Sequence, residues 1–99
     1  MSIKNEVLKY LKENKENFTK KYGIKEIYLF GSVARGEDNI KSDIDLMIEF
    51  KDFKSNTFDN YYGFLEEIEN QFKRKIDLAI KGAIKPVAFK YIKRDLINA

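Results

Sequence analysis

The chain has 99 residues and contains neither cysteine nor histidine. This composition excludes disulfides, thiol nucleophiles, Cys/His zinc sites and serine–histidine triads, so any metal ion must be bound through oxygen. The net charge of +3, from 19 basic and 16 acidic residues, is too small to indicate a dedicated nucleic-acid-binding protein. The length predicts one domain over residues 1–99, and the lack of a long apolar run or of an apolar signal sequence predicts a cytoplasmic protein without a membrane span.

The N-terminal part of the chain predicts a helix followed by a strand. Apolar residues recur every three or four positions over residues 3–21, which predicts an amphipathic helix with Ser2 as its N-cap and Gly23 at its end. Residues 25–30 are rich in β-forming side chains and predict a short strand that leads directly into Gly31.

A turn or short helix over residues 31–42 separates this strand from a second one, predicted over residues 43–50. Apolar and polar side chains alternate along the second strand, so one face is expected in the core and the other in solvent. The core face comprises Ile44, Leu46, Ile48 and Phe50, and the solvent face comprises Asp43, Asp45, Met47 and Glu49.

The C-terminal half predicts two helices with a strand between them. Apolar and aromatic residues at helical spacing predict a helix over residues 58–73, and the alternation around Asp77 predicts a third strand over residues 75–81. Pro86 suits the first turn of a last helix over residues 86–97, whose apolar face comprises Val87, Ala88, Tyr91, Ile92 and Leu96. The order of elements predicts an α/β (α+β) fold with a small mixed β-sheet flanked by helices.

The dipeptide Gly31-Ser32, at the end of the first strand, is a candidate phosphate site. A strand that ends in glycine and serine before a short helix directs backbone N–H groups and a hydroxyl toward one place, and glycine permits a close approach. An ordinary turn with an N-cap is the more frequent explanation of a lone Gly-Ser pair.

Asp43 and Asp45 are a stronger signal than the Gly-Ser pair. Aspartate is depleted in strands, and aspartates at positions i and i+2 project from the same face with α-carbons about 6.6 Å apart. Carboxylates at this spacing suit Mg²⁺, which prefers oxygen ligands and completes its octahedron with substrate phosphates. The alternative is a solvated strand face.

Asp77 stands alone on the polar side of the third strand. It is either a solvating charge on an edge strand or, if the second and third strands are neighbours, the third carboxylate of one cluster. In the second case Asp43, Asp45 and Asp77 would bind two Mg²⁺ ions, which favour in-line displacement at the α-phosphorus of a nucleotide. Asp77 is then also the candidate general base for the attacking hydroxyl.

These motifs resemble those of the polymerase-beta-type nucleotidyltransferases, over nearly the whole chain. The matching segments are Gly31-Ser32, Ser42-Asp43-Ile44-Asp45-Leu46 and Ile76-Asp77-Leu78. The short length and the form Gly-Ser-x-Ala-Arg-Gly are similar to the minimal nucleotidyltransferase branch, many of whose members are antitoxins paired with a HEPN-family ribonuclease toxin. The resemblance implies a polymerase-beta-like nucleotidyltransferase core.

The resemblance also implies a nucleotide site and a metal site. It assigns Gly31 and Ser32 to the triphosphate of ATP. It assigns Asp43, Asp45 and Asp77 to the Mg²⁺ ions. Arg35 lies in the Ala-Arg-Gly part of the motif and is a candidate phosphate contact. The alternative for Arg35 is a structural salt bridge to Glu37 or Asp38.

The implied activity is Mg²⁺-dependent transfer of AMP from ATP to a hydroxyl of a partner protein, with a HEPN-type toxin as the partner. A chain of 99 residues leaves no room for a template-binding lobe, so processive synthesis is excluded and the acceptor is expected on a separate protein. The alternative is a binding module that masks its partner and has a weak or vestigial nucleotide site. A small-molecule adenylyltransferase is disfavoured, because such enzymes add a substrate domain.

Two surface features complete the predictions. The aromatic side chains of residues 58–73 are expected in the core, or against a partner or a second copy of the chain. The basic clusters at residues 73–75 and 90–94 are expected as solvated helix ends, with an RNA-binding patch as the alternative. Direct binding of nucleic acid is therefore not the leading expectation.

Overall fold

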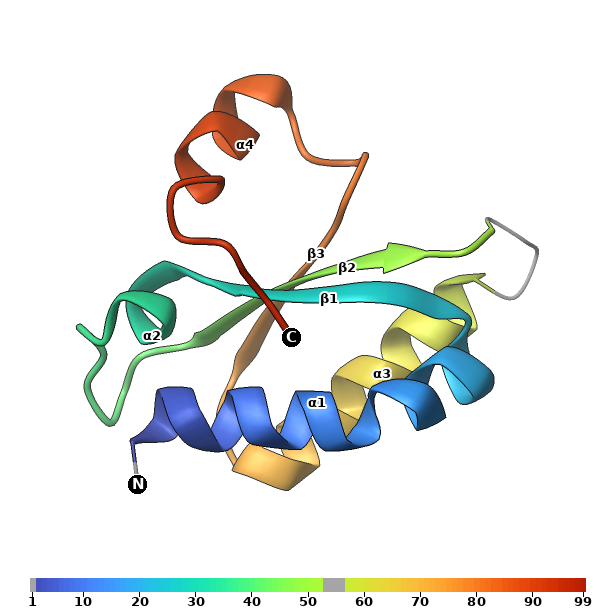
Figure 1. The fold of residues 1–99 in the computed structure, drawn as a ribbon, viewed down its shortest axis with the longest axis horizontal. Coiled ribbons are helices and arrows are strands. Elements are labelled where there is room, and N and C mark those ends of the chain that lie inside the picture. The colour runs from blue at the N-terminus through green and yellow to red at the C-terminus, as the bar shows by residue number, and fades with distance from the viewer. Residues whose placement is uncertain (1, 53–56) are drawn as a thin grey trace.

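The computed structural model describes residues 2–52 and 57–99. These segments form a four-stranded sheet of order β3-β2-β1-β4, in which β2 is parallel to β3 and the other neighbours are antiparallel (Figure 1). The predicted mixed sheet with flanking helices is thus confirmed. The elements in chain order are α1 (Ile3–Tyr22), β1 (Ile24–Phe30), α2 (Gly31–Arg35), β2 (Ile44–Phe50), α3 (Thr57–Phe72), β3 (Ile76–Ile80), α4 (Pro86–Ile92) and β4 (Ile97–Asn98).

The first helix, α1, begins and ends at the predicted caps. The Ser2 hydroxyl accepts a hydrogen bond from the Asn5 N–H at 3.2 Å, and Gly23 adopts a left-handed conformation with φ +69°. The Gly23 N–H closes the last turn on the Thr19 carbonyl, which is the usual function of a glycine at this position. Although α1 has 20 residues, neither it nor any other helix within residues 2–52 and 57–99 is long and apolar enough to cross a membrane.

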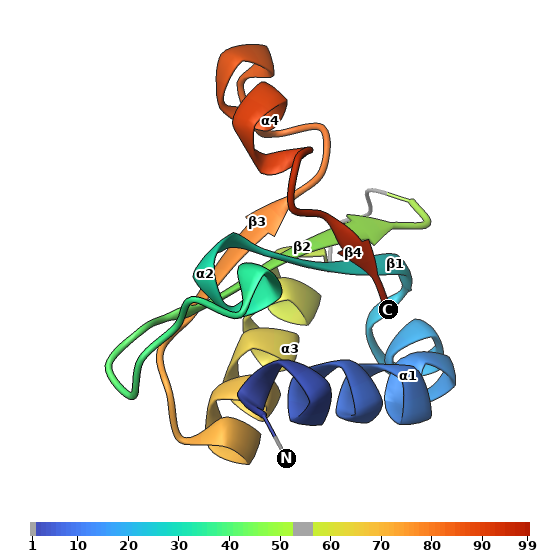
Figure 2. The same cartoon turned by 60° about the vertical axis from the view of Figure 1, so that its left-hand side comes forward.

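The core lies between one face of the sheet and the helices α1 and α3, which cover that face (Figures 1 and 2). Phe18 of α1 and Phe64 of α3 meet edge to face with their ring centroids 5.0 Å apart. Both side chains are buried with the apolar side chains of β1 and β2, and each contributes about 1.5–3 kcal/mol of hydrophobic stabilisation. The opposite face of the sheet is the side on which α4 stands (Figure 2).

The five elements predicted before residue 82 are confirmed, with each end within one residue of its expected position. The segment predicted as a turn or short helix begins with the five-residue helix α2, which ends at Gly36 with φ +73°. Asp43 lies one residue before β2, so the predicted strand start at this residue is displaced by one position.

The prediction of a last helix over residues 86–97 is wrong in length and in burial. The helix α4 ends at Ile92, and the chain then returns to the sheet, where Ile97 pairs with Leu29 of β1. No residue of α4 is buried, and the side chains of Val87 and Tyr91 are 72% and 66% exposed. Pairing with β1 ends the helix because it requires an extended backbone at residues 97–98.

One further expectation about burial is wrong. Alternation predicts Met47 on the solvent face of β2, but it is fully buried between Tyr28 and Ala79 of the neighbouring strands, on the side of α4. The aromatic side chains of α3 divide between the two expected places, since Phe64 is buried in the core whereas Phe58 and Tyr62 are exposed, as on a partner-facing surface.

Candidate active site

Gly31 lies where β1 ends, and its surroundings accept only glycine. Its φ of +76° is in the left-handed region, which side chains rarely adopt. A Cβ on Gly31 would overlap a carboxylate oxygen of Asp45 and would lie 2.9 Å from its Cγ. The end of β1 also pairs with β2 in the sheet, because Phe30, the residue before Gly31, is the register partner of Asp45. The Gly-Ser turn therefore packs directly against the second aspartate of the Asp-x-Asp motif.

The carboxylates of Asp45 and Asp77 lie on neighbouring strands at the same level. β2 and β3 are parallel neighbours, and Asp45 is paired with Asp77. The two strands are therefore adjacent, as a shared cluster of their carboxylates requires. Ile44, Leu46, Ile76 and Leu78 are buried under α1 and α3, so alternation directs both aspartates to the opposite face, on the side of α4. Asp43 lies just before β2, and its carboxylate is 3.9 Å from the Lys75 Nζ.

Burial and the neighbouring carboxylates disfavour the ionised form of Asp45. Burial, followed by the charges of Asp77 and Asp43, raises the pKa of the Asp45 carboxyl from 3.8 to about 6, while the Arg35 guanidinium opposes the rise. A carboxyl with this pKa is largely ionised at neutral pH but is destabilising in that form. A cation at this position would relieve the repulsion.

The donor set fits Mg²⁺ as a pair of neighbouring carboxylates. Within residues 2–52 and 57–99, no three acidic side chains lie close enough to form a complete metal site by themselves. Mg²⁺ does not require one, because it is usually held by one or two carboxylates while water and substrate phosphates supply the remaining ligands. Assignment of the ion to Asp43, Asp45 and Asp77 stays a prediction.

Arg35 is held by two carboxylates rather than left free beside the turn. Its Nε donates to Glu37 at 3.0 Å, and its Nη1 donates to Asp95 at 2.8 Å. The alternative of a salt bridge to Glu37 is therefore realised, while Asp38 lies 3.8 Å from Arg74 instead. The bond to Asp95 joins residues 60 positions apart, and no local sequence signal indicates it.

Arg74 supports the loop that precedes Asp43, a role that sequence reasoning missed. Its Nη1 donates to the carbonyl oxygens of Asn39 and Ser42, each at 3.3 Å, and the Ser42 hydroxyl accepts from the Asn39 N–H at 2.9 Å. The Arg74 side chain is only 19% exposed. The expectation that residues 73–75 form a solvated helix end is thus wrong for Arg74.

Arg74→Ala is expected to lower the free energy of unfolding by about 1 kcal/mol, because it removes two long, charge-assisted hydrogen bonds to the loop. Urea unfolding of this variant and of Lys73→Ala measures the difference, since Lys73 is the adjacent exposed cation. Equal stability of the two variants would show that Arg74 does not support the loop.

A Gly-Ser turn beside two carboxylate-bearing strands is the arrangement expected of a nucleotidyltransferase, and comparison with known sequences gives the family. The sequence model of the family "Nucleotidyltransferase domain" matches residues 6–99. The chain belongs to the nucleotidyltransferase family. A relative from Methanocaldococcus jannaschii, "Putative protein adenylyltransferase MJ1379", is 39% identical over 98 residues, which are 98% of each chain.

Solved structures share the fold. One described as "Structure of putative minimal nucleotidyltransferase" has a TM-score of 0.76 and 24% identity, and the match covers 98% of this chain and 95% of that chain. A complex of a tri-AMPylated HEPN toxin with an MNT antitoxin, from Shewanella oneidensis, contains a chain with a TM-score of 0.59 and 19% identity, which matches 96% of this chain over 66% of its own length. At these identities the likeness shows a common fold.

Proposed function

We propose that this nucleotidyltransferase transfers AMP from ATP to a hydroxyl of a partner protein, a HEPN-type toxin, and so silences it. The observation that carries the proposal is the pairing of Asp45 with Asp77 on parallel strands, with Gly31 packed against the Asp45 carboxylate. Relatives and structures named for adenylyl transfer and for a toxin–antitoxin complex support it. The expected ATP substrate and cytoplasmic location belong to the same proposal.

The positions of the candidate residues support the following roles. Gly31 and Ser32 would bind the triphosphate, since the turn leaves the backbone of Gly31 uncovered by any side chain of its own. Asp43 and Asp45, with Asp77, would hold Mg²⁺, which supplies positive charge to the phosphates when bound. Arg35 would approach a phosphate from the side of α2, where Glu37 and Asp95 fix its orientation.

Asp77 would receive the proton of the acceptor. It is exposed on β3, an edge strand of the sheet, so a hydroxyl of another protein can reach it. The hydroxyl oxygen forms a bond to the α-phosphorus, the bond from this phosphorus to the departing pyrophosphate breaks, and the proton passes to the Asp77 carboxylate. The products are an AMP ester of the acceptor and pyrophosphate.

The test is to incubate the protein with ATP, Mg²⁺ and the protein encoded beside it, and to weigh that protein intact. A mass increase of one or more AMP groups is expected with the native chain, and none with Asp43→Ala. The matched control is Asp59→Ala, which removes an exposed carboxylate on α3. An unmodified neighbour under conditions in which the protein binds ATP would contradict the proposal.

A second function, masking of the partner without catalysis, is favoured by one observation: Arg35, the candidate phosphate contact, is already bound to Glu37 and Asp95. The two functions differ in what Asp43→Ala does to toxin neutralisation. Masking leaves neutralisation intact in this variant, whereas AMP transfer predicts its loss.

A further inference from the structure

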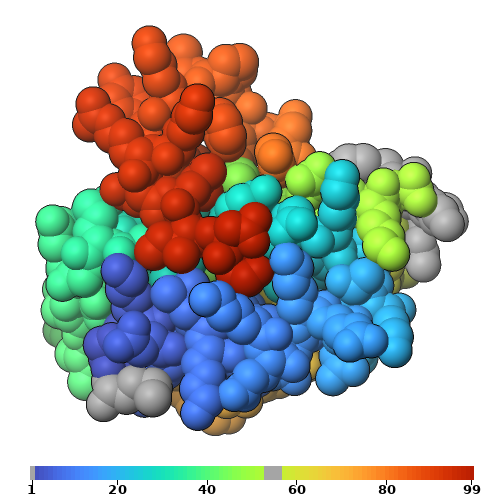
Figure 3. All heavy atoms as spheres, in the orientation of Figure 1, coloured from blue at the N-terminus to red at the C-terminus, as the bar shows by residue number. Residues whose placement is uncertain are grey.

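The helix α4 is the least supported element of the fold and carries an unusual surface. It stands apart from the rest of the molecule on the face of the sheet opposite α1 and α3 (Figures 2 and 3). None of its residues is buried, so its own packing does not explain its apolar side chains. A short helix without burial is marginal in water unless something else covers it.

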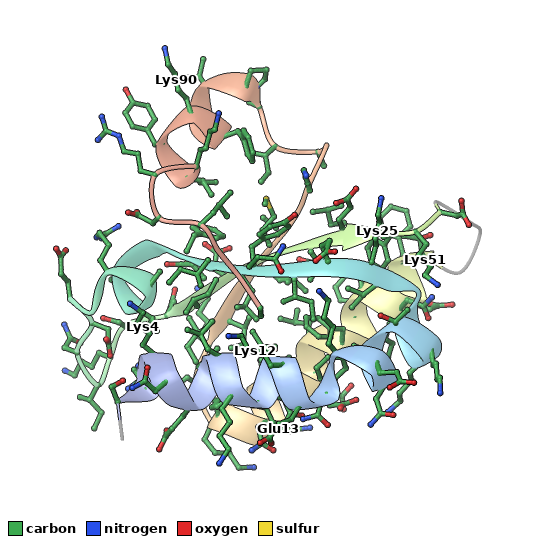
Figure 4. All side chains as sticks on the ribbon, viewed as in Figure 1. Lys4, Lys12, Glu13, Lys25, Lys51 and Lys90 are labelled. Carbon is green, nitrogen blue, oxygen red and sulfur yellow. The ribbon has the colours of Figure 1, made fainter. Side chains whose placement is uncertain are left out.

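One side of α4 combines apolar anchors with positive charge. Val87 and Tyr91 are four residues apart and are 72% and 66% exposed. Lys90, in α4, and Arg94, just after its end, are also exposed, and Lys90 points away from the body of the protein (Figure 4). We call these four residues the α4 docking face.

The charge on this part of the chain is uncompensated. Residues 84–94 include Lys85, Lys90, Lys93 and Arg94 but no acidic residue. None of these four cations forms an ion pair with an acidic residue of the described segments, whereas Lys15 and Lys21 of α1 do. An acidic surface is therefore the electrostatic complement of α4.

The docking face is also connected to the candidate active site at both ends. β3, which carries Asp77, leads into α4, and Asp95 after α4 bonds to Arg35 beside the Gly-Ser turn. Asp45 and Asp77 face the same side of the sheet as α4. A protein that extends from α4 over this side of the sheet would reach the carboxylates.

We infer that α4 docks the acceptor protein of the AMP transfer, in an apolar groove of that protein rimmed by aspartate and glutamate. The inference rests on the proposed function for the identity of the partner. Two apolar anchors at i and i+4 are the pattern of a helix that lies in a groove, and tyrosine and arginine are enriched at such interfaces. A nucleic acid is a poorer occupant, because Val87 can neither pair with a phosphate nor stack on a base.

The test uses the full chain and, as probe, the protein encoded beside it. Val87→Ala/Tyr91→Ala and Lys90→Glu/Arg94→Glu should each weaken its binding about tenfold or more, through KM rather than kcat of the transfer. Binding of ATP with Mg²⁺ should be unchanged, and so should the circular dichroism, because the four substituted side chains are exposed. The matched control is Lys9→Glu/Lys12→Glu, which reverses two exposed charges on α1.

Native affinity in the α4 variants, or equal loss in the α1 control, would overturn the inference. Two further outcomes would also overturn it, both with normal binding of the neighbouring protein. Loss of self-association in the α4 variants would show that α4 binds a second copy of the chain, and loss of binding of an RNA oligonucleotide would show that it binds a nucleic acid. If the native chain binds the neighbour through α4 without modifying it, docking stands and the AMP transfer fails. If it neither binds nor modifies the neighbour, both fail.

Discussion

Asp45→Asn is expected to reduce AMP transfer about a hundred- to ten-thousandfold and at the same time to make the protein more stable at neutral pH. Loss of a carboxylate that positions the metal costs several kcal/mol of transition-state stabilisation. The gain in stability has a separate origin, because the pKa of Asp45 rises from 3.8 to about 6 on folding. The ionised form is therefore less favourable in the folded protein than in the unfolded chain.

The sign of the pH dependence follows from proton binding. Between about pH 4 and pH 6 the folded protein holds the Asp45 proton more tightly than the unfolded chain does, so this group's contribution to stability falls as pH rises through the window. Above about pH 6 the ionised Asp45 carboxylate destabilises the folded protein by its full amount. A shift of two pKa units corresponds to about 3 kcal/mol, and solvent screening of this partly exposed carboxyl reduces the cost to about 1–2 kcal/mol.

Urea unfolding in the presence of a chelator measures this cost. The free energy of unfolding of Asp45→Asn should exceed that of the native protein by about 1–2 kcal/mol at pH 8 and by little or nothing near pH 4. ATP with Mg²⁺ should then stabilise the native protein but not the variant. A variant that is less stable than the native protein at both pH values would show that the Asp45 carboxylate is not under electrostatic strain.

Gly31→Ala is expected to abolish transfer and to destabilise the fold by about 2–4 kcal/mol. The left-handed backbone, at φ +76°, costs an alanine about 1–2 kcal/mol. The new methyl group also occupies the space of the Asp45 carboxylate, which must move away from the site. Activity should therefore fall much more than the loss of stability alone explains.

Gly36→Ala provides the matched control, because Gly36 has a φ of +73° but no atom within 4 Å of an added Cβ. This variant should lose about 1–2 kcal/mol of stability and keep its activity. In an Asp45→Ala background the stability cost of Gly31→Ala should shrink toward that of Gly36→Ala, because the overlapping carboxylate is absent. Equal effects of Gly31→Ala and Gly36→Ala on both activity and stability would show that backbone strain alone is involved.

Most of the fold can be predicted from the sequence because its elements carry local signals. Ser2 and Gly23 define the ends of α1 through contacts within three or four residues, and the alternation around Leu46 defines β2. The errors come from distant contacts. Met47 is buried by neighbouring strands, and the end of α4 is set by pairing of Ile97 with β1, about which spacing along the chain carries no information.

The same division holds for the candidate site. The sequence by itself determined the residue types, because Gly31, Asp43 and Asp45 belong to patterns that can be recognised within one turn and one strand. Only the tertiary structure decided that Asp77 lies beside Asp45, that the Asp45 carboxylate packs on Gly31 and that Asp95 binds Arg35. The physical reason is that strand order and register depend on the packing of the whole sheet against α1 and α3, which no local pattern specifies.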